Sequence, residues 1–338
     1  MASSPSTAEQ GGLEEETFSL QTELPDEAFE TVEEIEGLLA ATARRAPEPL
    51  VAPSLAALTS GGKRLRPLLL VLSARMGEPD HDHLLGAATA IEVLHTATLI
   101  HDDIVDRAES RRGLPTTAAR YGRDVAVATG DYLFAESFHD LAEIGDPRLV
   151  RAFAEAAEGL AAGELEQYRA NGETVEVEAY LEHIRKKTAG LFKAACVAGG
   201  SLGGLSLRQI DALAGYGQAL GIAFQMSDDV MDLVGKPGLM GKGIGTDLAE
   251  GTVTLPVIFA LREGDTAKIK QVLFTPNPSQ ELLDAGIEAV LSTDAVAKTE
   301  AWAKDEVAAA IEGLELLPEG PERGLLEFVA TEVVGRDA

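Results

Sequence analysis

Apolar residues recur at spacings of three and four residues through almost the whole chain, from about residue 25 to about residue 335. Phe153, Ala157 and Leu160 are one example, and such spacing places apolar side chains along one face of an α-helix. Glycine and proline interrupt the pattern at intervals, as at Gly61-Gly62. No alternating strand pattern with a hairpin turn occurs. The sequence therefore predicts an all-α protein, folded as a single large bundle.

Length alone suggests a different organisation, because 338 residues would ordinarily make about two domains. The uniform helical pattern outweighs that prior, and we expect one folded domain over residues 26–338. The N-terminal segment differs in composition, since the first thirty residues hold eight acidic residues and no Lys or Arg. We predict that residues 1–25 form a disordered acidic tail.

The charge balance excludes one class of partner. The chain has 28 Lys and Arg against 56 Asp and Glu, a formal net charge of −28. A general nucleic-acid binder neutralises phosphates with Lys and Arg, so no nucleic-acid partner is expected. No uninterrupted run of about 20 apolar residues occurs, so no transmembrane segment is expected. With a single cysteine and no recognisable signal peptide, a cytoplasmic location is the default.

Two short acidic clusters each end an apolar helical run. The stretches HDDIVD and SDDVMD contribute Asp102, Asp103, Asp106, Asp228, Asp229 and Asp232. On a helix, residues four apart share a face, so each cluster stacks two carboxylates that repel each other without a partner. Hard oxygen ligands at this spacing suit Mg²⁺, which commonly combines carboxylates with phosphate oxygens of a substrate. A solvated acidic helix end would explain one such cluster, but two are harder to dismiss.

Several cations of this acidic chain stand in short motifs, some of them shortly after the aspartate clusters. They are Lys63, Arg64 and Arg66 after a glycine pair, then Arg111, Arg112, Lys187 and Lys242. Each alone is explained equally well by a surface salt bridge or a helix-end cation. Together with the carboxylates they describe a site with metal ligands and several phosphate contacts. We therefore expect diphosphate substrates.

At these residues the sequence resembles the trans-isoprenyl diphosphate synthases, or polyprenyl synthetases, and is most similar to the long-chain members. The resemblance runs from about residue 30 to about residue 335. It is carried by the ordered motifs GGKRLRP, HTATLIHDDIVDRAESRRGLPT, GDYLF, GELEQ, RKKTAGLF, FQMSDDVMD and GKGIGTDLAEGTVTLP. The resemblance implies long antiparallel helices around a deep central cavity, a homodimer, and two aspartate clusters that face each other across the cavity mouth.

The resemblance also implies roles for individual residues. The six aspartates would bind Mg²⁺, three ions in all, on an allylic diphosphate. That diphosphate would be held by Arg111, Lys187 and Lys242, with Thr188 and Gln225 beside the developing allylic cation. The isopentenyl diphosphate site would consist of Lys63, Arg66, His95 and Arg112. His95 alone reads as an ordinary buried helix histidine, and Lys236 competes with Lys242 for one role.

The expected reaction is Mg²⁺-dependent head-to-tail condensation of isopentenyl diphosphate with an allylic diphosphate. The expected product is a long-chain all-trans-polyprenyl diphosphate of C30 to C50, for use as a quinone side chain. In the family, short-chain members often carry an aromatic residue four or five positions before the first aspartate, where this chain has the small residues Ala97 and Thr98. Small residues here are also explained by close helix packing. The candidate cavity walls are Ala97, Thr98, Leu94, Ile91 and, deeper, Phe153.

Three alternatives remain open. A geranylgeranyl or farnesyl diphosphate synthase would share every motif and differ in product length. A class I terpene cyclase also uses aspartate-rich helices and Mg²⁺, but it has little need for a second diphosphate site. A non-catalytic prenyltransferase subunit would be expected to have lost aspartates, whereas both clusters are complete here. Transient membrane contact during product release fits a long apolar product.

Overall fold

The structure is a computed structural model that describes residues 26–111, 113–170, 176–235, 244–263 and 266–335, apart from the side chains of residues 26–29 and 167–170. Its N-terminal half consists of α2 (Asp26–Arg45), α3 (Val51–Leu58), α4 (Leu65–Arg75), α5 (His81–Val105), α6 (Thr117–Tyr121), α7 (Arg123–Ile144) and α8 (Pro147–Ala170). The predicted acidic tail, residues 1–25, lies outside the described residues and stays a prediction.

The chain continues through a second series of helices. These are α9 (Val177–Ile184), the π-helix η1 (Arg185–Ala189), α10 (Gly190–Leu202), α11 (Leu207–Val234), α12 (Thr246–Ala249), α13 (Leu255–Glu263), α14 (Thr266–Leu273), α15 (Gln280–Leu291), α16 (Ala295–Gly313), the 3₁₀-helix η2 (Leu314–Leu316) and α17 (Pro321–Val334). The predicted all-α fold class is confirmed.

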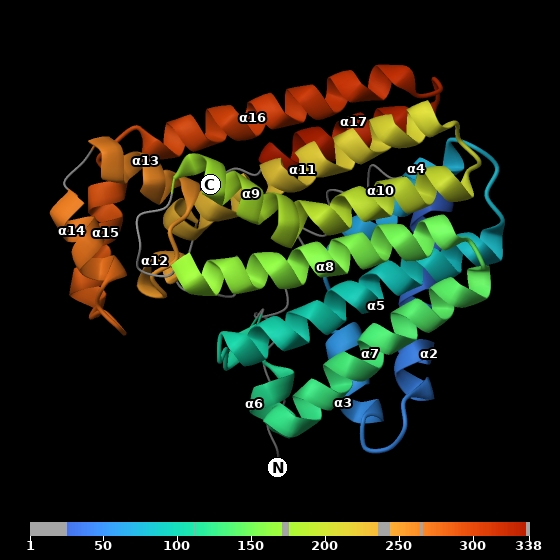
Figure 1. Cartoon of the computed structure of the whole chain (residues 1–338), viewed down its shortest axis with the longest axis horizontal. Coiled ribbons are helices and arrows are strands. Elements are labelled where there is room, and N and C mark those ends of the chain that lie inside the picture. Colours follow the sequence, from blue (N-terminus) through green and yellow to red (C-terminus); the bar gives the residue numbers. More distant parts are fainter. Residues whose placement is uncertain (1–25, 112, 171–175, 236–243, 264–265, 336–338) are drawn as a thin grey trace, which may run out of the picture.

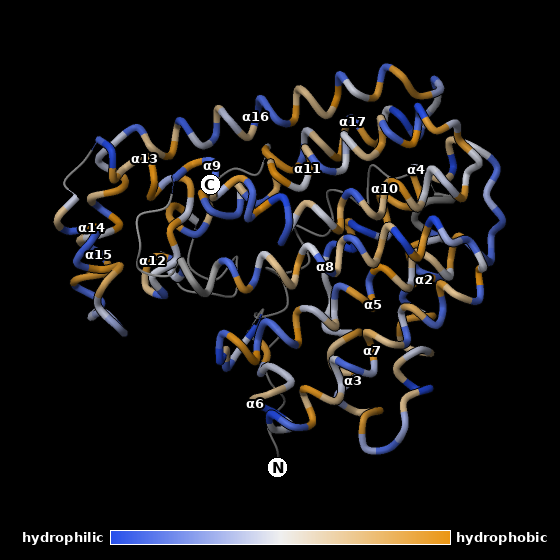
Figure 2. Tube along the Cα trace, viewed as in Figure 1, coloured by the Kyte–Doolittle hydropathy of each residue, from blue (hydrophilic) through white to orange (hydrophobic). Residues whose placement is uncertain are grey.

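The long helices pack side by side as a bundle (Figure 1). Helix α5 packs on α7, α10 packs on α4, α8 and α11, and α16 packs on α11. The short helices α14 and α15 pack against each other at one end of the bundle, at the left of Figure 1. Short hydrophobic and hydrophilic stretches follow one another along the helices (Figure 2), as amphipathic helices with one buried face require.

Helix α5 lies at the centre of the larger hydrophobic core. It begins at a capping residue, Asp80, whose carboxylate accepts a hydrogen bond from the backbone N–H of His83 at 3.0 Å. Its sequence is long and apolar enough to cross a membrane, with a mean hydropathy of 1.3 over its best 18-residue window. Polar residues such as Glu92 and His95 interrupt its apolar sequence, which is why no membrane span is expected there. Within the protein, 72% of that window is buried, as expected of a core helix.

One pair of very short strands departs from the helical pattern. Strand β1 (Ser110–Arg111) pairs antiparallel with β2 (Leu114–Pro115), and Gly113 in the connecting turn has a positive φ of 74°. Two-residue strands are too short to produce an alternating sequence pattern, which is why the sequence did not predict them. Their effect is local: Arg111 belongs to β1, and its guanidinium contacts Asp103 of the first aspartate cluster.

Candidate active site

The two aspartate clusters line a single cavity of about 940 Å³. Helix α5 contributes Asp102 and Asp106 at its C-terminal end, and α11 contributes Asp228, Asp229 and Asp232. The two clusters are therefore brought together by the packing of helices that are far apart in sequence. The two-cluster site predicted from sequence exists as one cavity with carboxylates from both helices.

The first cluster combines high negative charge with partial burial. Asp102 is half-buried, and Asp106 is exposed at the end of α5. Burial raises the pKa of Asp102 to about 7; the nearby Lys187 lowers the pKa, and the carboxylates of Glu164 and Asp106 raise it. A cation bound at this place would remove the repulsion between these carboxylates. The donor set, carboxylate oxygens from two helices, fits Mg²⁺.

The middle residue of the first cluster has a different environment. Asp103 is 5% exposed and does not belong to the cavity lining. Its Oδ1 accepts a hydrogen bond from Nε of Arg111 at 2.8 Å, so an ion pair links α5 to the β1–β2 hairpin. Arg111 itself lines the cavity. In this structure Asp103 thus orients Arg111, a residue predicted to bind diphosphate. The metal-binding role predicted for Asp103 stays a prediction.

The middle residue of the second cluster is at the centre of a hydrogen-bond chain that runs from the buried Tyr180 to the half-buried Thr188. The Tyr180 hydroxyl donates to Oδ2 of Asp229 at 2.6 Å, and Nε2 of Gln225 donates to Oδ1 of Asp229 at 2.9 Å. The Thr188 hydroxyl in turn donates to Oε1 of Gln225 at 2.7 Å. Burial and, after it, the nearby Asp247 raise the pKa of Asp229 to about 8, against the lowering effect of the two hydrogen bonds. Thr188 and Gln225, predicted to lie beside the allylic group, do line the same cavity.

The last residue of the second cluster caps a short helix. Oδ1 of Asp232 accepts from the backbone N–H of Thr246 at 3.1 Å, and Oδ2 accepts from that of Asp247 at 3.2 Å. These bonds fix the start of α12 against the end of α11. Gly245, directly before α12, has a φ of 71°, which favours glycine. Asp232 therefore anchors α12 as well as lining the cavity.

The π-helix η1 presents two adjacent lysines. Lys187 forms an ion pair with Glu164 of α8 at 2.6 Å, and Lys186 forms one with Glu166 of the same helix at 2.9 Å. The short π-helix is closely packed: a Cβ on Gly221 of α11 would lie 2.5 Å from Cα of Ala189. π-Helical turns of this kind are frequent at functional sites. Here Lys187 reaches the cavity beside Asp102.

The predicted isopentenyl diphosphate residues are brought together only in part. Arg66 and His95 line the cavity, and the Arg66 guanidinium lies 4.7 Å from the centroid of the Phe192 ring. Lys63 is half-buried and does not line the cavity. Arg112 lies outside the described residues, as does Lys242 together with its competitor Lys236, so their predicted roles stay predictions.

Arg64, between the two predicted phosphate ligands of this motif, has a structural role. It is 7% exposed, and its guanidinium contacts Glu36 at 2.5 Å, Glu92 at 2.7 Å and the carbonyl of Leu58 at 2.8 Å. Its backbone has a φ of 47°, a left-handed conformation that is strained for a residue with a side chain. These contacts hold the loop that positions Lys63 and Arg66.

The predicted chain-length residues have different positions relative to the cavity. Thr98 lines it, and its hydroxyl donates to the carbonyl of His95 at 2.8 Å. The others are completely buried in the larger core and do not line the cavity: Ala97, Leu94, Ile91 and Phe153. Among the described residues, the apolar lining consists chiefly of Val105, Leu99, Leu160, Ala179, Ile184, Leu191, Phe224 and Val253.

Several cavity residues received no role from the sequence. They are Glu164, Glu166, Tyr180, Glu182, His183, Lys186, Asp247 and Glu250. Glu164 and Glu166 stand in the GELEQ motif, and Asp247 and Glu250 stand in the motif that follows the second cluster, so a signal for these four was present. Tyr180 precedes the lysine motif with no recognisable spacing to the aspartates, and nothing in the sequence pointed to it.

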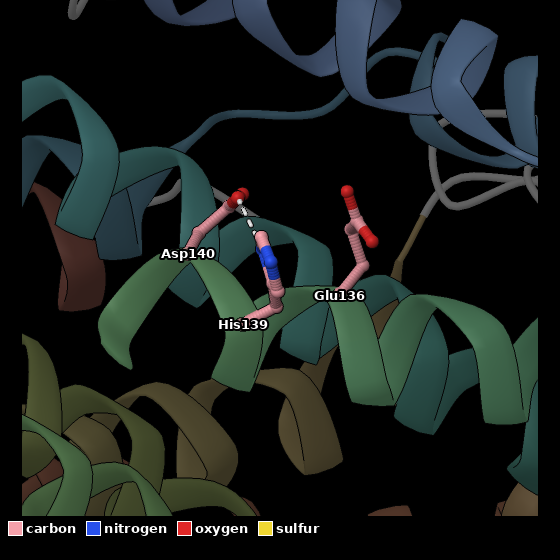
Figure 3. A group of neighbouring side chains, drawn as sticks. All are labelled: Glu136, His139 and Asp140. Atoms are coloured by element: carbon pink, nitrogen blue, oxygen red, sulfur yellow. Dashed lines mark ion pairs between the residues drawn. The ribbon is translucent and has the colours of Figure 1, made fainter. Parts of the chain in front are cut away.

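Another group of possible metal ligands lies outside the cavity lining, on α7. Figure 3 shows Glu136, His139 and Asp140, whose ligand atoms lie within 4.8 Å of one another. Nε of Arg45 donates to Glu136 at 2.7 Å, and a terminal nitrogen of the same guanidinium donates to Asp140 at 3.0 Å. The guanidinium thus supplies the positive charge at this place, and the group fits a salt-bridge cluster between α2 and α7.

The site agrees with a comparison against families and known proteins. Residues 48–290 match the family model described as polyprenyl synthetase. Heptaprenyl diphosphate synthase component 2 of Geobacillus stearothermophilus is 36% identical over 292 residues, 86% of this chain and 90% of that protein. Octaprenyl diphosphate synthase of Escherichia coli is 35% identical over 283 residues, 82% of this chain and 87% of that protein.

The fold agrees as well. The crystal structure of a polyprenyl synthase from Caulobacter crescentus, in complex with calcium and isoprenyl diphosphate, superposes with a TM-score of 0.86. It is 33% identical and covers 92% of this chain and 96% of that one. The family model spans most of the sequence and includes both aspartate clusters. The chain therefore belongs to the polyprenyl synthetase family of prenyltransferases.

Proposed function

We propose that the protein elongates an allylic diphosphate with isopentenyl diphosphate, head to tail, to a long-chain all-trans-polyprenyl diphosphate of C30 to C50. The observation that carries this proposal is the single cavity that holds carboxylates from α5 and α11 together with Arg66, Arg111 and Lys187. A cyclase acting on one diphosphate needs one set of cations, whereas here cations extend from the α4 side to η1. This distribution suits two diphosphate groups.

The residues of the chain have distinct tasks in this reaction. Arg111 and Lys187, with Lys242, hold the allylic diphosphate, and their charge stabilises it as a leaving group. Arg66 and His95, with Lys63 and Arg112, hold isopentenyl diphosphate so that its double bond lies near the allylic carbon. The apolar side chains of Leu99, Leu160, Leu191 and Phe224 exclude water that would quench the developing cation. The expelled pyrophosphate accepts the final proton.

Asp102, Asp106 and Asp228 are the aspartates proposed to hold Mg²⁺, with support from Asp103, Asp229 and Asp232. When bound, Mg²⁺ supplies Lewis-acid neutralisation of the diphosphate charge, and three ions are part of the proposal. Support comes from the Caulobacter relative, whose structure contains a divalent cation and an isoprenyl diphosphate. Burial and, after it, the carboxylates of Glu164 and Asp106 raise the pKa of Asp102, and a bound cation would relieve this repulsion.

Product length is the finer part of the proposal. Support comes from the names of the heptaprenyl and octaprenyl relatives and from the small residues Ala97 and Thr98 one turn before Asp102. We expect Ala97→Phe to shorten the product, because its ring would fill space beneath the cavity. Ala97 is completely buried and its surroundings must yield to admit the ring. Product chain length measured by mass spectrometry checks this, and an unchanged length would contradict it.

One assay tests the whole proposal. The purified chain is incubated with Mg²⁺, isopentenyl diphosphate and each allylic primer in turn, and the products are measured by mass spectrometry. Diphosphates of C30 or longer support the proposal. Products that stop at C15 or C20 identify a short-chain synthase, and a hydrocarbon from the primer alone identifies a cyclase. No turnover by the chain alone, with turnover after addition of a partner subunit, identifies a component of a heteromer.

The proposal includes a homodimer in the cytoplasm, with transient membrane contact during product release. The name of the Geobacillus relative, component 2, makes a heteromeric assembly the alternative. Molar mass in solution, measured by light scattering on the purified chain, distinguishes a dimer from a monomer that awaits another subunit.

A further inference from the structure

Tyr180 is the buried end of the hydrogen-bond chain at the second aspartate cluster. Its side chain comes from α9, is 5% exposed, and donates its hydroxyl to Oδ2 of Asp229 on α11 at 2.6 Å. Asp229 is 2% exposed, so its carboxylate depends on protein donors in place of water. Tyr180 and Gln225 supply one donor to each of its two oxygens.

The chain leaves the Gln225 amide one favourable orientation. Its Nε2 donates to Asp229 at 2.9 Å, and its Oε1 accepts from the Thr188 hydroxyl at 2.7 Å. When Asp229 is ionised, a rotated amide would bring its oxygen against the carboxylate, and two acceptors would then face each other. The orientation of Gln225 thus follows from that of Asp229, which is held from its other side by Tyr180.

We propose that Tyr180 is a positioning residue of the allylic site, which holds the Gln225 amide and the Thr188 hydroxyl in one arrangement through Asp229. This inference rests on the proposed function, because it gives these two cavity-lining groups a task beside the allylic cation. Dipoles that are oriented before the reaction stabilise developing charge without having to reorganise. Tyr180 itself acts through Asp229.

A second buried tyrosine provides the matched control. Tyr216 on α11 is 1% exposed and donates its hydroxyl to the carbonyl of Leu326 at 2.7 Å. It does not line the cavity. Tyr180→Phe and Tyr216→Phe therefore each remove one buried hydroxyl that donates one hydrogen bond, one of them at the cavity and one remote from it.

The experiment measures kcat, both KM values and Tm for the two variants. We expect both to unfold at a lower temperature, because each removes a buried hydrogen bond. Only Tyr180→Phe is expected to lower kcat, by about tenfold, with the KM for isopentenyl diphosphate changed by less than about twofold. Tyr216→Phe is expected to keep kcat within about twofold of the wild type.

A double-mutant cycle then tests the route through Gln225. If Tyr180 acts through the chain, Tyr180→Phe has less than about a twofold further effect on kcat in a Gln225→Ala background. Should Tyr180→Phe fail to fold, 3-fluorotyrosine at position 180, which makes the hydroxyl more acidic and nearly keeps its size, takes its place in the cycle.

Each outcome decides the question. A kcat loss specific to the cavity tyrosine and non-additive with Gln225→Ala supports the inference. Equal kcat for the two tyrosine variants overturns it, as do additive effects in the cycle, and both leave the proposed function intact because the wild-type enzyme turns over. Wild-type protein that makes no prenyl diphosphate overturns the proposed function, and this inference with it.

Discussion

The aspartate clusters on α5 and α11 repeat the pattern DDxxD, yet their surroundings differ. On α5, Asp102 is half-buried beside Lys187, and Asp106 is exposed. On α11, Asp229 and Asp232 are buried, and their carboxylates accept hydrogen bonds from protein donors. The first cluster thus offers accessible charge at Asp106 and holds the β1–β2 hairpin through the buried Asp103 alone, while two buried aspartates of the second cluster hold α9 and α12. The same spacing therefore does not make corresponding aspartates equivalent.

The largest effects are expected at the first aspartate of each cluster, Asp102 and Asp228, because both line the cavity. We expect Asp102→Ala and Asp228→Ala each to reduce kcat by at least about 10³-fold, about 4 kcal/mol, because each removes a ligand from the proposed metal site. Circular dichroism is expected to show unchanged helix content. Near-normal turnover in either variant, or turnover in excess chelator, would contradict the metal assignment.

Replacing single cations distinguishes the proposed allylic diphosphate site from the proposed isopentenyl diphosphate site. We expect Arg111→Ala to raise the KM for the allylic substrate by roughly 10- to 100-fold, from the loss of a charge-assisted hydrogen bond worth about 1.5–3 kcal/mol. Lys63→Ala and Arg112→Ala are expected to raise the KM for isopentenyl diphosphate instead. Steady-state kinetics with each substrate varied in turn checks this. An equal rise in both KM values for all three variants would show that the assigned division is wrong.

The pH dependence of the free energy of unfolding distinguishes Asp229 from Asp102. The folded pKa of Asp229 is about 8, raised mainly by burial, while the ordinary value is 3.8. Between these values the folded state binds one more proton than the unfolded state, so stability falls as the pH rises. The free energy of unfolding of metal-free protein should lose at most about 1.4 kcal/mol per pH unit from this group, and Asp229→Asn should remove that loss.

Asp102 provides the internal comparison for this measurement. Its folded pKa is about 7, so Asp102→Asn should flatten the pH dependence only up to about that value. Urea unfolding in chelator at several values between pH 5 and pH 8.5 measures the slopes. Identical slopes for Asp229→Asn and the wild type above pH 7 would mean that burial does not hold this proton.

The smallest expected effect concerns the last aspartate of each cluster. Asp232→Ala should lower the free energy of unfolding by about 1 kcal/mol, because its carboxylate caps α12 through the N–H groups of Thr246 and Asp247. Asp106→Ala removes an exposed carboxylate and should change it by less than about 0.5 kcal/mol. Urea unfolding of the two variants is the measurement. Equal losses would remove the distinction between the clusters.

Much of the site could be predicted because its signals are local. The DDxxD spacing, the glycine pair before Lys63 and the helical periodicity are each formed by residues only a few positions apart. Five of the six aspartates, with Arg66, His95, Arg111, Lys187, Thr188 and Gln225, do line the cavity. Asp103 and Lys63 do not, because helix packing and loop geometry determine which side of a motif faces inward.

The sequence by itself determined the helical class, the family and the positions of the carboxylates, because short-range patterns and ordered motifs encode them. Tertiary structure alone decided which groups hold one another. Tyr180 and Asp229 are 49 residues apart, and Arg64 is 28 residues from both Glu36 and Glu92. Such pairs have no shared periodicity. They form only when helices pack and bury polar groups away from water, which makes a hydrogen-bond partner from another helix necessary.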